Sequence, residues 1–268
     1  AAYNFLSFSG MLLASGLFGI MAGWLKLSAR QIWLLVGIAT IPVCLAAFWL
    51  VLHRVVYVLV GAFFKTFYRV RLHGLENVPE KSGAMLIANH ITWIDGLLLL
   101  SQSPRPLRMI THKDYILPGP VGRRLARDYG IIPIMPGRKS VVQSIRTARE
   151  ALRQGELVCV FPEGGLSRTG QINPFHPGFL TMLKGTGAPV IPVHLGGLWG
   201  SIFSFERGKW FWKWPRRVPY PVSIRFGRPV HNVTDSHQVR QAVQELETES
   251  MEEDKHRRGK MVPPRRFL

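Results

Sequence analysis

The sequence has 268 residues, more than one compact unit usually needs, and it is both basic and apolar. Lysine and arginine total 34 against 16 aspartate and glutamate residues, which gives a formal charge of +18 and a pI of about 10.8. This charge predicts an anionic partner, while 47% hydrophobic residues and a mean hydropathy of +0.11 argue against a soluble nucleic-acid binder and favour a membrane surface.

The N-terminal part of the chain carries two uncharged apolar runs, at residues 5–25 and 32–52. Each is about 20 residues long, which is the length that crosses a hydrocarbon core of about 30 Å. We therefore expect two transmembrane helices; the alternative is a pair of buried helices in a soluble protein. A signal peptide fits poorly, because no basic segment precedes the first run and a second run follows it.

A third apolar stretch, residues 55–64, is too short to span a bilayer and is expected to be an interfacial stretch, with a re-entrant segment as the alternative. Lys65, Arg69 and Arg71 follow it, and the positive-inside rule places this basic side in the cytoplasm. Residues 1–64 are accordingly predicted to form a membrane segment.

From about Val70 the sequence alternates short apolar segments with helical patterns, which is typical of an α/β domain. We expect a mostly parallel sheet flanked by helices on both faces, over residues 65–250. The helical periodicity is clearest over residues 140–154, and Gly155 is a suitable stop. The predicted strands cover residues 85–88, 107–110, 131–134, 157–161, 190–194 and 222–226, and the predicted helices begin near Asp95, Gly119, Ser140 and Pro177.

Two polar stretches complete the chain. Trp210, Trp212 and Trp214 alternate with lysine and arginine, which predicts either an interfacial belt or an ordinary exposed loop. Residues 251–268 are highly charged and end in Pro-Pro-Arg-Arg-Phe-Leu, so we expect a linker rather than a packed element.

Residues 89–96, NHITWIDG, place a histidine and an aspartate between two apolar segments. Five positions on a continuous helix turn by about 500°, so His90 and Asp95 meet only if the chain changes conformation between them. A strand that ends near Asn89 and a helix that starts near Asp95 would bring them together. A neutral histidine paired with an aspartate is suited to deprotonate an attacking hydroxyl. We expect His90 to be a general base and Asp95 its orienting partner; the alternative is a buried histidine capped by an aspartate.

Three further stretches accompany this one, at residues 130–138 (GIIPIMPGR), 160–170 (VFPEGGLSRTG) and 190–197 (VIPVHLGG). The four stretches, in this order and at these separations, resemble the glycerolipid acyltransferase family, whose best-known members are the 1-acylglycerol-3-phosphate acyltransferases. The resemblance covers residues 72–230 and implies a glycerol-3-phosphate acyltransferase-like α/β fold. It also implies direct transfer of an acyl group from a thioester to an acceptor hydroxyl, without a serine or cysteine nucleophile.

The resemblance also assigns substrate contacts. It implies that Arg138 contacts the acceptor phosphate and that Glu163 and Gly164 belong to the substrate-binding loop. The family's commonest pattern continues after Phe-Pro-Glu-Gly with Thr-Arg-Ser, whereas this chain has Gly-Leu-Ser-Arg at residues 165–168. Arg168 is therefore expected to supply the cation from two positions later.

No metal or cofactor is expected. Cys44 and Cys159 have no cysteine or histidine at metal-binding spacing, which argues against a zinc site or a disulfide framework. No ligand cluster for magnesium or another metal stands out. Both cysteines are predicted to be packing residues.

Residues 1–52, together with the departure after Phe-Pro-Glu-Gly, resemble bacterial fusions in which a major facilitator lysophospholipid transporter precedes a 2-acylglycerophosphoethanolamine acyltransferase and an acyl-carrier-protein synthetase. The resemblance implies an excised middle piece of a longer polypeptide, in the bacterial inner membrane, with its catalytic domain on the cytoplasmic face. The expected function is an O-acyltransferase that moves a fatty acyl group from acyl carrier protein or coenzyme A to a lysophospholipid, with lysophosphatidylethanolamine as the first choice. Membrane lipids are expected partners and nucleic acid is not.

Three rival functions remain at this point. One is a lysophosphatidic acid acyltransferase in phosphatidic acid synthesis. Another is a non-catalytic lipid-binding accessory domain of a transporter, which the two apolar spans suggest. The last, a basic nucleic-acid binder, rests on charge alone.

Overall fold

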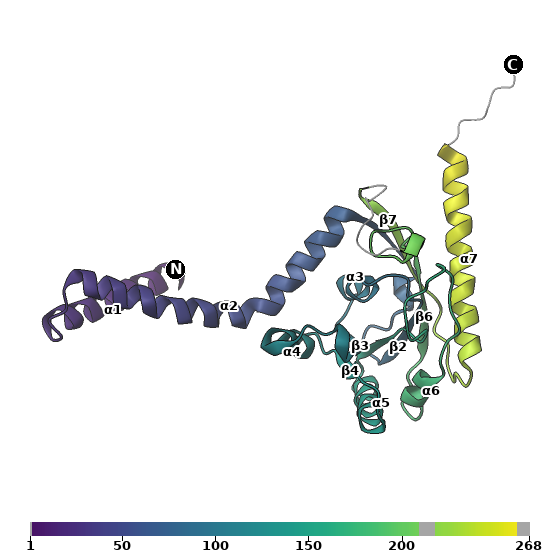
Figure 1. Cartoon of the computed structure of the whole chain (residues 1–268), viewed down its shortest axis with the longest axis horizontal. Helices are drawn as coiled ribbons and strands as arrows, with labels where there is room; N and C mark the ends of the chain where they lie inside the picture. The colour runs from purple at the N-terminus through teal and green to yellow at the C-terminus, as the bar shows by residue number, and fades with distance from the viewer. Residues whose placement is uncertain (1, 209–217, 262–268) are drawn as a thin grey trace, which may run out of the picture. The chain divides into compact units, whose positions relative to one another are not determined.

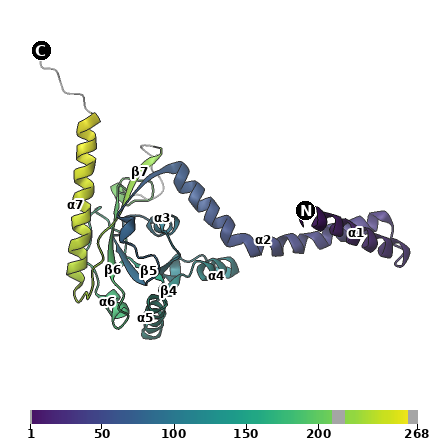
Figure 2. The ribbon, with the colours of Figure 1, turned by 180° about the vertical axis from the view of Figure 1, so that it is seen from behind.

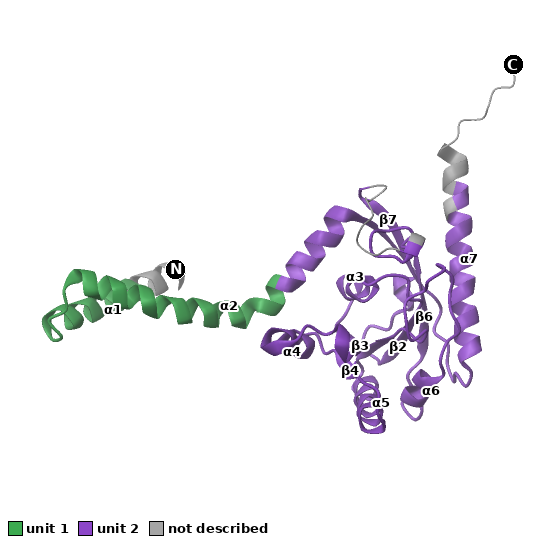
Figure 3. Ribbon diagram, viewed as in Figure 1, with its two compact units in different colours: residues 1–55 green, residues 56–268 purple. Residues whose placement is uncertain are grey.

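The structure, a computed structural model, describes residues 2–208 and 218–261 (Figure 1). It divides into two compact units, residues 1–55 and residues 56–268 (Figure 3). The sequence predicts this boundary after residue 64. The predicted tryptophan belt at residues 210–214 and the last part of the predicted linker, residues 262–268, lie outside the described residues.

Unit 1 consists of helix α1, Ala2–Gly23, and the first part of helix α2, Ala29–Phe67. Both predicted apolar runs are therefore helical. Among the described residues, α2 is the helix that is long and apolar enough to cross a membrane, with a mean hydropathy of 2.4 in its most apolar window. In helix α1, residues Gly10–Gly23 are apolar but form a shorter segment than α2.

Helix α2 does not stop at the predicted end of the second span. Residues 53–67 contain no proline, and an isolated glycine such as Gly61 is tolerated inside a helix. Within unit 2, Phe64 is 1% exposed and joins the hydrophobic core, with Val60 and Phe63 packed against it. The end of this stretch thus contributes to the core of the α/β unit, whereas Tyr57, Val58 and Leu59 are 56–64% exposed, and for these residues the interfacial placement stays a prediction.

The described residues of unit 2 form a seven-stranded sheet in the order β1-β7-β6-β2-β5-β3-β4 (Figures 1 and 2). Neighbouring strands are parallel except β6 and β7, which run antiparallel. The predicted mostly parallel sheet is thus confirmed. The strands are β1 Tyr68–His73, β2 Ala84–Ala88, β3 Leu107–His112, β4 Ile132–Ile134, β5 Leu157–Val160, β6 Val190–Gly196 and β7 Tyr220–Phe226.

Strand β1 is the one that the sequence does not predict. It alternates apolar and basic residues directly after the apolar N-terminal part, and the sequence alone assigns it to the membrane border. Its partner β7 lies about 150 residues later in the chain, so only the folded sheet defines it as a strand.

Helices cover both faces of the sheet, as predicted. Side chains of α5, α6 and α7 pack on one face, and those of α3 and the end of α2 pack on the other. Successive side chains of strand β2 point to opposite faces of the sheet: Leu86 packs on the α3 side, and Met85 and Ile87 pack on the α5 side. The helices are α3 Asp95–Gln102, α4 Gly119–Asp128, α5 Arg138–Arg153, α6 Gly178–Leu183 and α7 Ser236–Met261.

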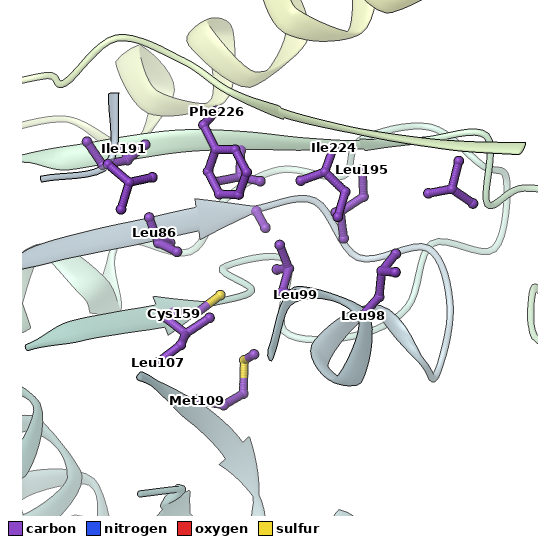
Figure 4. Close-up of a cluster of buried hydrophobic side chains, with 14 of the residues drawn as sticks. Leu86, Leu98, Leu99, Leu107, Met109, Cys159, Ile191, Leu195, Ile224 and Phe226 are labelled. Carbon is purple, nitrogen blue, oxygen red and sulfur yellow. The ribbon is translucent and has the colours of Figure 1, made fainter. Parts of the chain in front are cut away.

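The core on the α3 side fixes the elements that flank the NHITWIDG stretch (Figure 4). Leu86 on β2 and Leu98 and Leu99 on α3 are each at most 1% exposed. Burying one leucine side chain stabilises the fold by roughly 1.5–3 kcal/mol. The loop between β2 and α3 is therefore held at both ends by packed apolar side chains.

Helix α7 runs through the predicted domain boundary at residue 250. Arg225 on β7 has a side chain 11% exposed, and its guanidinium group donates to the carboxylate of Glu253 on α7. Glu249, one turn earlier, lies 3.8 Å from the same guanidinium group. Residues 251–261 are therefore helical, and the helix packs on the sheet at least as far as Glu253, which corrects the expectation of a linker from residue 251.

This ion pair gives the first prediction. Glu253→Gln should lower the free energy of unfolding by about 1–3 kcal/mol, because it leaves a mostly buried guanidinium group without its nearest carboxylate. Glu252→Gln is the matched control, since Glu252 is an exposed neighbour on the same helix. Thermal unfolding of the purified full chain measures both. Equal melting temperatures for the two variants would show that the α7 contact does not stabilise the fold.

Candidate active site

The site begins where strand β2 ends. Asn89 is 1% exposed, and its side chain exchanges two hydrogen bonds with the backbone of Leu195 on β6, at 2.7 and 3.2 Å. The side-chain amide thus continues the ladder of the sheet by one residue. Because Asn89 is held in this way, the next residue, His90, leaves the sheet at a defined point.

His90 and Asp95 meet across the turn between β2 and α3. His90 Nδ1 lies 3.0 Å from Asp95 Oδ2. A carboxylate accepts hydrogen bonds, so this contact selects the tautomer in which Nδ1 carries the proton, and in the neutral imidazole the lone pair is on Nε2. The predicted juxtaposition is therefore present, and it arises from the predicted change from strand to helix between the two residues.

The carboxylate of Asp95 accepts hydrogen bonds from other groups besides the His90 ring. Oδ2 accepts the backbone N–H groups of Ile91 and Thr92 at 2.6 and 2.8 Å, and Oδ1 accepts the Thr92 hydroxyl. Asp95 is 0% exposed and is the first residue of α3, where the helix dipole favours a negative charge. A fully buried carboxylate is tolerable only with such donors, so the loop and the charge stabilise each other.

The loop after strand β5 holds the backbone of His90 from the other side. The His90 N–H donates to Glu163 Oε1 at 2.8 Å, and the His90 carbonyl accepts from the Ser167 N–H at 2.8 Å. Glu163 Oε2 in turn accepts the Asn173 N–H at 3.0 Å. Burial raises the pKa of Glu163 above its ordinary value, and the two N–H donors partly oppose this.

The imidazole of His90 stacks on Phe161, with ring centroids 4.1 Å apart and an interplanar angle of 15°. Its side chain keeps 22% exposure, because one edge faces a cavity of about 370 Å³. The cavity lies at the carboxyl ends of the parallel strands β2, β3, β4 and β5, where α/β sheets place ligands.

The cavity wall is mostly apolar, with Met109, Ile134, Val160, Phe179 and Met182 among its lining residues. Polar and titratable groups come from the histidines at positions 90, 112 and 176 and from Thr111 and Tyr115. Among the residues that the structure describes, none of those lining the cavity is lysine or arginine. Such a wall suits an acyl chain or an uncharged part of a lipid better than a free anion.

The predicted substrate-binding residues take different places. Gly164 lines the cavity with a φ of +70°, and a Cβ there would lie 3.1 Å from the His176 ring, so the position suits glycine. Glu163 is buried behind the wall and holds backbone rather than facing the cavity. Arg138, the first residue of α5, and Arg168 are exposed and are not among the lining residues. The guanidinium carbon of Arg168 lies 5.4 Å from the ring centroid of Phe205.

Several residues of the site could not be found from the motif alone. Thr92, Phe161, Ser167 and Asn173 each contact His90, Asp95 or Glu163 in the folded chain. Thr92, Phe161 and Ser167 lie within the predicted stretches, and this position was the only sequence signal that pointed to them. Asn173 lies beyond the predicted stretches and contacts Glu163 through its backbone N–H and its side chain, so no motif pointed to it.

Within the described ranges, no group of three or more histidine, cysteine, aspartate or glutamate side chains could hold a metal ion.

Two titratable residues of the core, His194 and Cys159, occupy packing positions. Burial, with the Arg225 guanidinium group nearby, lowers the pKa of His194 to about 4, and burial raises the pKa of the Cys159 thiol. His194 is thus neutral near pH 7.

Comparisons with known proteins agree with this geometry. Residues 69–196 match the family model described as Acyltransferase. The chain is 29% identical over 133 residues to a chloroplastic 1-acyl-sn-glycerol-3-phosphate acyltransferase of Brassica napus, covering 49% of this chain and 38% of that protein. A 1-acyl-sn-glycerol-3-phosphate acyltransferase of Borreliella burgdorferi is 28% identical over 130 residues, covering 47% and 51%. The chain thus spans about half or less of the length of these relatives.

A solved structure shares the fold. The crystal structure of the 1-acyl-sn-glycerophosphate acyltransferase PlsC from Thermotoga maritima superposes with a TM-score of 0.58 at 24% identity, over 76% of this chain and 81% of that one. Residues 69–196 thus carry a domain that matches the Acyltransferase family model, and over this region the chain is similar to 1-acyl-sn-glycerol-3-phosphate acyltransferases.

The Asp95 carboxylate gives the second prediction. Asp95→Asn should reduce acyl-transfer turnover by at least about a hundredfold, because an amide cannot hold the His90 Nδ1–H and stabilise an imidazolium as a carboxylate does. Thr92→Val is the matched control: it removes the bond to Oδ1 but keeps the histidine contact, so it should cost less than about tenfold. Turnover is measured alongside melting temperature, and equal losses in the two variants would assign Asp95 to loop stability alone.

Proposed function

We propose that this chain is a membrane-bound lysophospholipid acyltransferase that works by general-base catalysis at His90. One observation carries the proposal. A histidine oriented by a buried aspartate faces a mostly apolar cavity, at the ligand-binding end of an acyltransferase fold. Acyl transfer between a thioester and a lipid hydroxyl requires both parts of this arrangement.

In the proposed mechanism, His90 Nε2 accepts the proton of the acceptor hydroxyl as its oxygen attacks the thioester carbonyl. Asp95 Oδ2 stabilises the imidazolium that forms, through the Nδ1–H. As the tetrahedral intermediate collapses, the new C–O ester bond remains, the C–S bond breaks and the thiolate takes the proton from Nε2. The apolar lining around His90 would limit competing attack by water.

The cavity wall favours an acceptor without a phosphate monoester. The relatives are named as 1-acyl-sn-glycerol-3-phosphate acyltransferases, and a phosphate monoester carries close to two negative charges that call for fixed cations. Here Leu166 lines the cavity where the common family pattern has arginine, and no described lining residue is a lysine or arginine. We therefore propose lysophosphatidylethanolamine, whose phosphate is a diester with one negative charge, as the preferred acceptor.

Acyl carrier protein is the proposed acyl donor, with coenzyme A as the alternative. The carrier is acidic, and the formal charge of +18 supports an electrostatic attraction to it. The proposed location is a bacterial inner membrane, with unit 2 on the cytoplasmic face. The apolar helix α2 and the basic residues at its end, Lys65, Arg69 and Arg71, support this orientation.

The third prediction tests the activity itself. The full chain in detergent micelles should transfer acyl groups from one of two donors, acyl carrier protein or coenzyme A thioesters, to lysophosphatidylethanolamine. His90→Ala should reduce the rate by at least about a hundredfold, since the general base is lost. It should lower the melting temperature only modestly, because the backbone N–H groups of Ile91 and Thr92 and the Thr92 hydroxyl still donate to Asp95. His176→Ala, which changes an exposed histidine of the cavity wall, is the control.

Each of the two acyl donors is tested with each of two acceptors, lysophosphatidylethanolamine and lysophosphatidic acid. The proposal is contradicted if no combination of donor and acceptor gives ester product while both the wild type and His90→Ala bind lysolipid equally. That outcome would support a non-catalytic lipid-binding domain instead.

The fourth prediction concerns acceptor choice. Leu166→Arg should raise the ratio of kcat/KM for lysophosphatidic acid over lysophosphatidylethanolamine by about tenfold, because one charge-assisted contact to phosphate contributes roughly 1.5–3 kcal/mol. Leu166→Gln, of similar length but neutral, should leave the ratio near that of the wild type. A wild-type enzyme that already prefers lysophosphatidic acid would establish the second candidate function, phosphatidic acid synthesis.

A further inference from the structure

Five large side chains that a soluble protein would cover are exposed near the cavity. Trp93, Leu97, Tyr115, Leu117 and Val121 are between 41% and 64% exposed. They come from the turn before α3, from α3 itself, from the segment after β3 and from α4. We refer to these five residues as the apolar rim.

Parts of the rim lie close together. Trp93 and Tyr115 pack edge to face, with ring centroids 4.7 Å apart. Leu97 lies in the first turn of α3, four residues after Trp93 in the chain. Leu117 lies directly against α4, because a Cβ built at Gly122 would fall 2.8 Å from its Cβ, and Val121 precedes that glycine.

The cavity opens into this rim. Trp93 and Tyr115 belong both to the rim and to the cavity lining that includes His90. Apolar surface therefore extends from the catalytic histidine outward to exposed residues such as Leu117. Exposed apolar patches at the mouth of a cavity mark sites of contact with a protein, a ligand or a membrane.

Charge narrows the choice of partner. The segment from residue 113 to residue 128 carries four basic and two acidic residues. Lys113, Arg123 and Arg127 are exposed. Of the two acidic residues, Asp128 is engaged by Arg124 at 2.7 Å, and Asp114, whose side chain is 83% exposed, lies 3.3 Å from His112 Nδ1. Figures 1 and 2 show α4 standing apart from α5, α6 and α7 within unit 2. Exposed leucine, valine, tryptophan and tyrosine next to basic side chains suit the headgroup boundary of an anionic bilayer.

We propose that the apolar rim and its flanking basic residues form a second membrane contact, which inserts into the interface of an anionic bilayer and opens the cavity toward the lipid. Its occupant is the bilayer rather than an acidic carrier protein, since the most exposed residues of the rim, Tyr115 and Leu117, are apolar or amphipathic and not charged. A carrier protein would be held mainly by the basic residues.

This contact gives a route by which a lysolipid reaches His90 without leaving the membrane. That part of the inference rests on the proposed function, whereas insertion of the rim into the bilayer does not. Unit 2 would meet the membrane through its own residues, in addition to any anchoring by α2.

The fifth prediction measures insertion directly. A nitrobenzoxadiazole fluorophore is attached at Leu117→Cys in the full chain, in a Cys44→Ser background, because Cys44 is exposed and Cys159 is buried. The chain is reconstituted into phosphatidylcholine–phosphatidylglycerol vesicles with brominated acyl chains. Fluorescence at position 117 should fall at least about twofold, since an inserted side chain lies about 5–10 Å into the boundary of headgroups and acyl chains.

Met251→Cys is the matched control. Met251 is 56% exposed and apolar, but lies on α7, at the opposite side of unit 2 from α4 in both views (Figures 1 and 2). Its fluorophore should not be quenched. A Lys113→Glu/Arg123→Glu double variant should weaken quenching at position 117 in vesicles with phosphatidylglycerol and change it little in phosphatidylcholine alone.

Activity forms a separate arm. Leu117→Asp should lower turnover of a bilayer-embedded lysolipid about tenfold while leaving turnover of a short-chain lysolipid in solution unchanged. Absence of quenching at position 117 in both vesicle types overturns the proposal. If, in addition, the charge-reversed variant raises KM for an acyl carrier protein donor, the surface binds the carrier instead. Quenching without any acyl transfer would support the membrane contact and contradict the proposed function.

Discussion

The buried carboxylate of Asp95 is the constraint on which the site depends. Its two oxygens accept from the His90 ring, two backbone N–H groups and the Thr92 hydroxyl, with no solvent contact. An ionised group in such a place is costly unless every lone pair is used. The same donors that offset that cost also fix the loop and choose the tautomer of His90. Burial, loop geometry and protonation state therefore depend on a single side chain.

The rest of unit 2 holds this group in place at two ends. Packed leucines anchor β2 and α3, and the loop after β5 fixes the His90 backbone through Glu163 and Ser167. The histidine is thus connected to two neighbouring parallel strands at their carboxyl ends. Glu163, in this arrangement, supports the site from behind the cavity wall. A raised pKa there reflects burial in a structural position and does not by itself indicate proton transfer.

Charge and apolar surface are separated at the site in a way that suits a lipid enzyme. The cavity interior is mostly apolar, while the exposed basic residues, including Arg138 and Arg168, lie outside its described lining. A lysolipid has the same division, with an apolar chain and a charged headgroup. The proposed acceptor preference follows from this division because the described cavity lining has no lysine or arginine. The proposed membrane contact follows from it because the apolar rim and exposed basic residues surround the cavity opening.

The sequence by itself determined the mostly parallel α/β architecture, the helical apolar N-terminal runs and the stretch that holds His90 and Asp95. These follow from local patterns: long and short apolar runs, helical periodicity over residues 140–154, and a strand-to-helix change between two polar residues. Tertiary structure alone decided what depends on distant partners. Strand β1 exists because it pairs with β7, Phe64 is buried because the end of α2 reaches the core of unit 2, and α7 packs beyond residue 250 because Glu253 contacts Arg225. Likewise, Leu166 lines the cavity and Arg168, two residues later, does not. Both lie in a loop, where no sequence periodicity predicts the direction of a side chain.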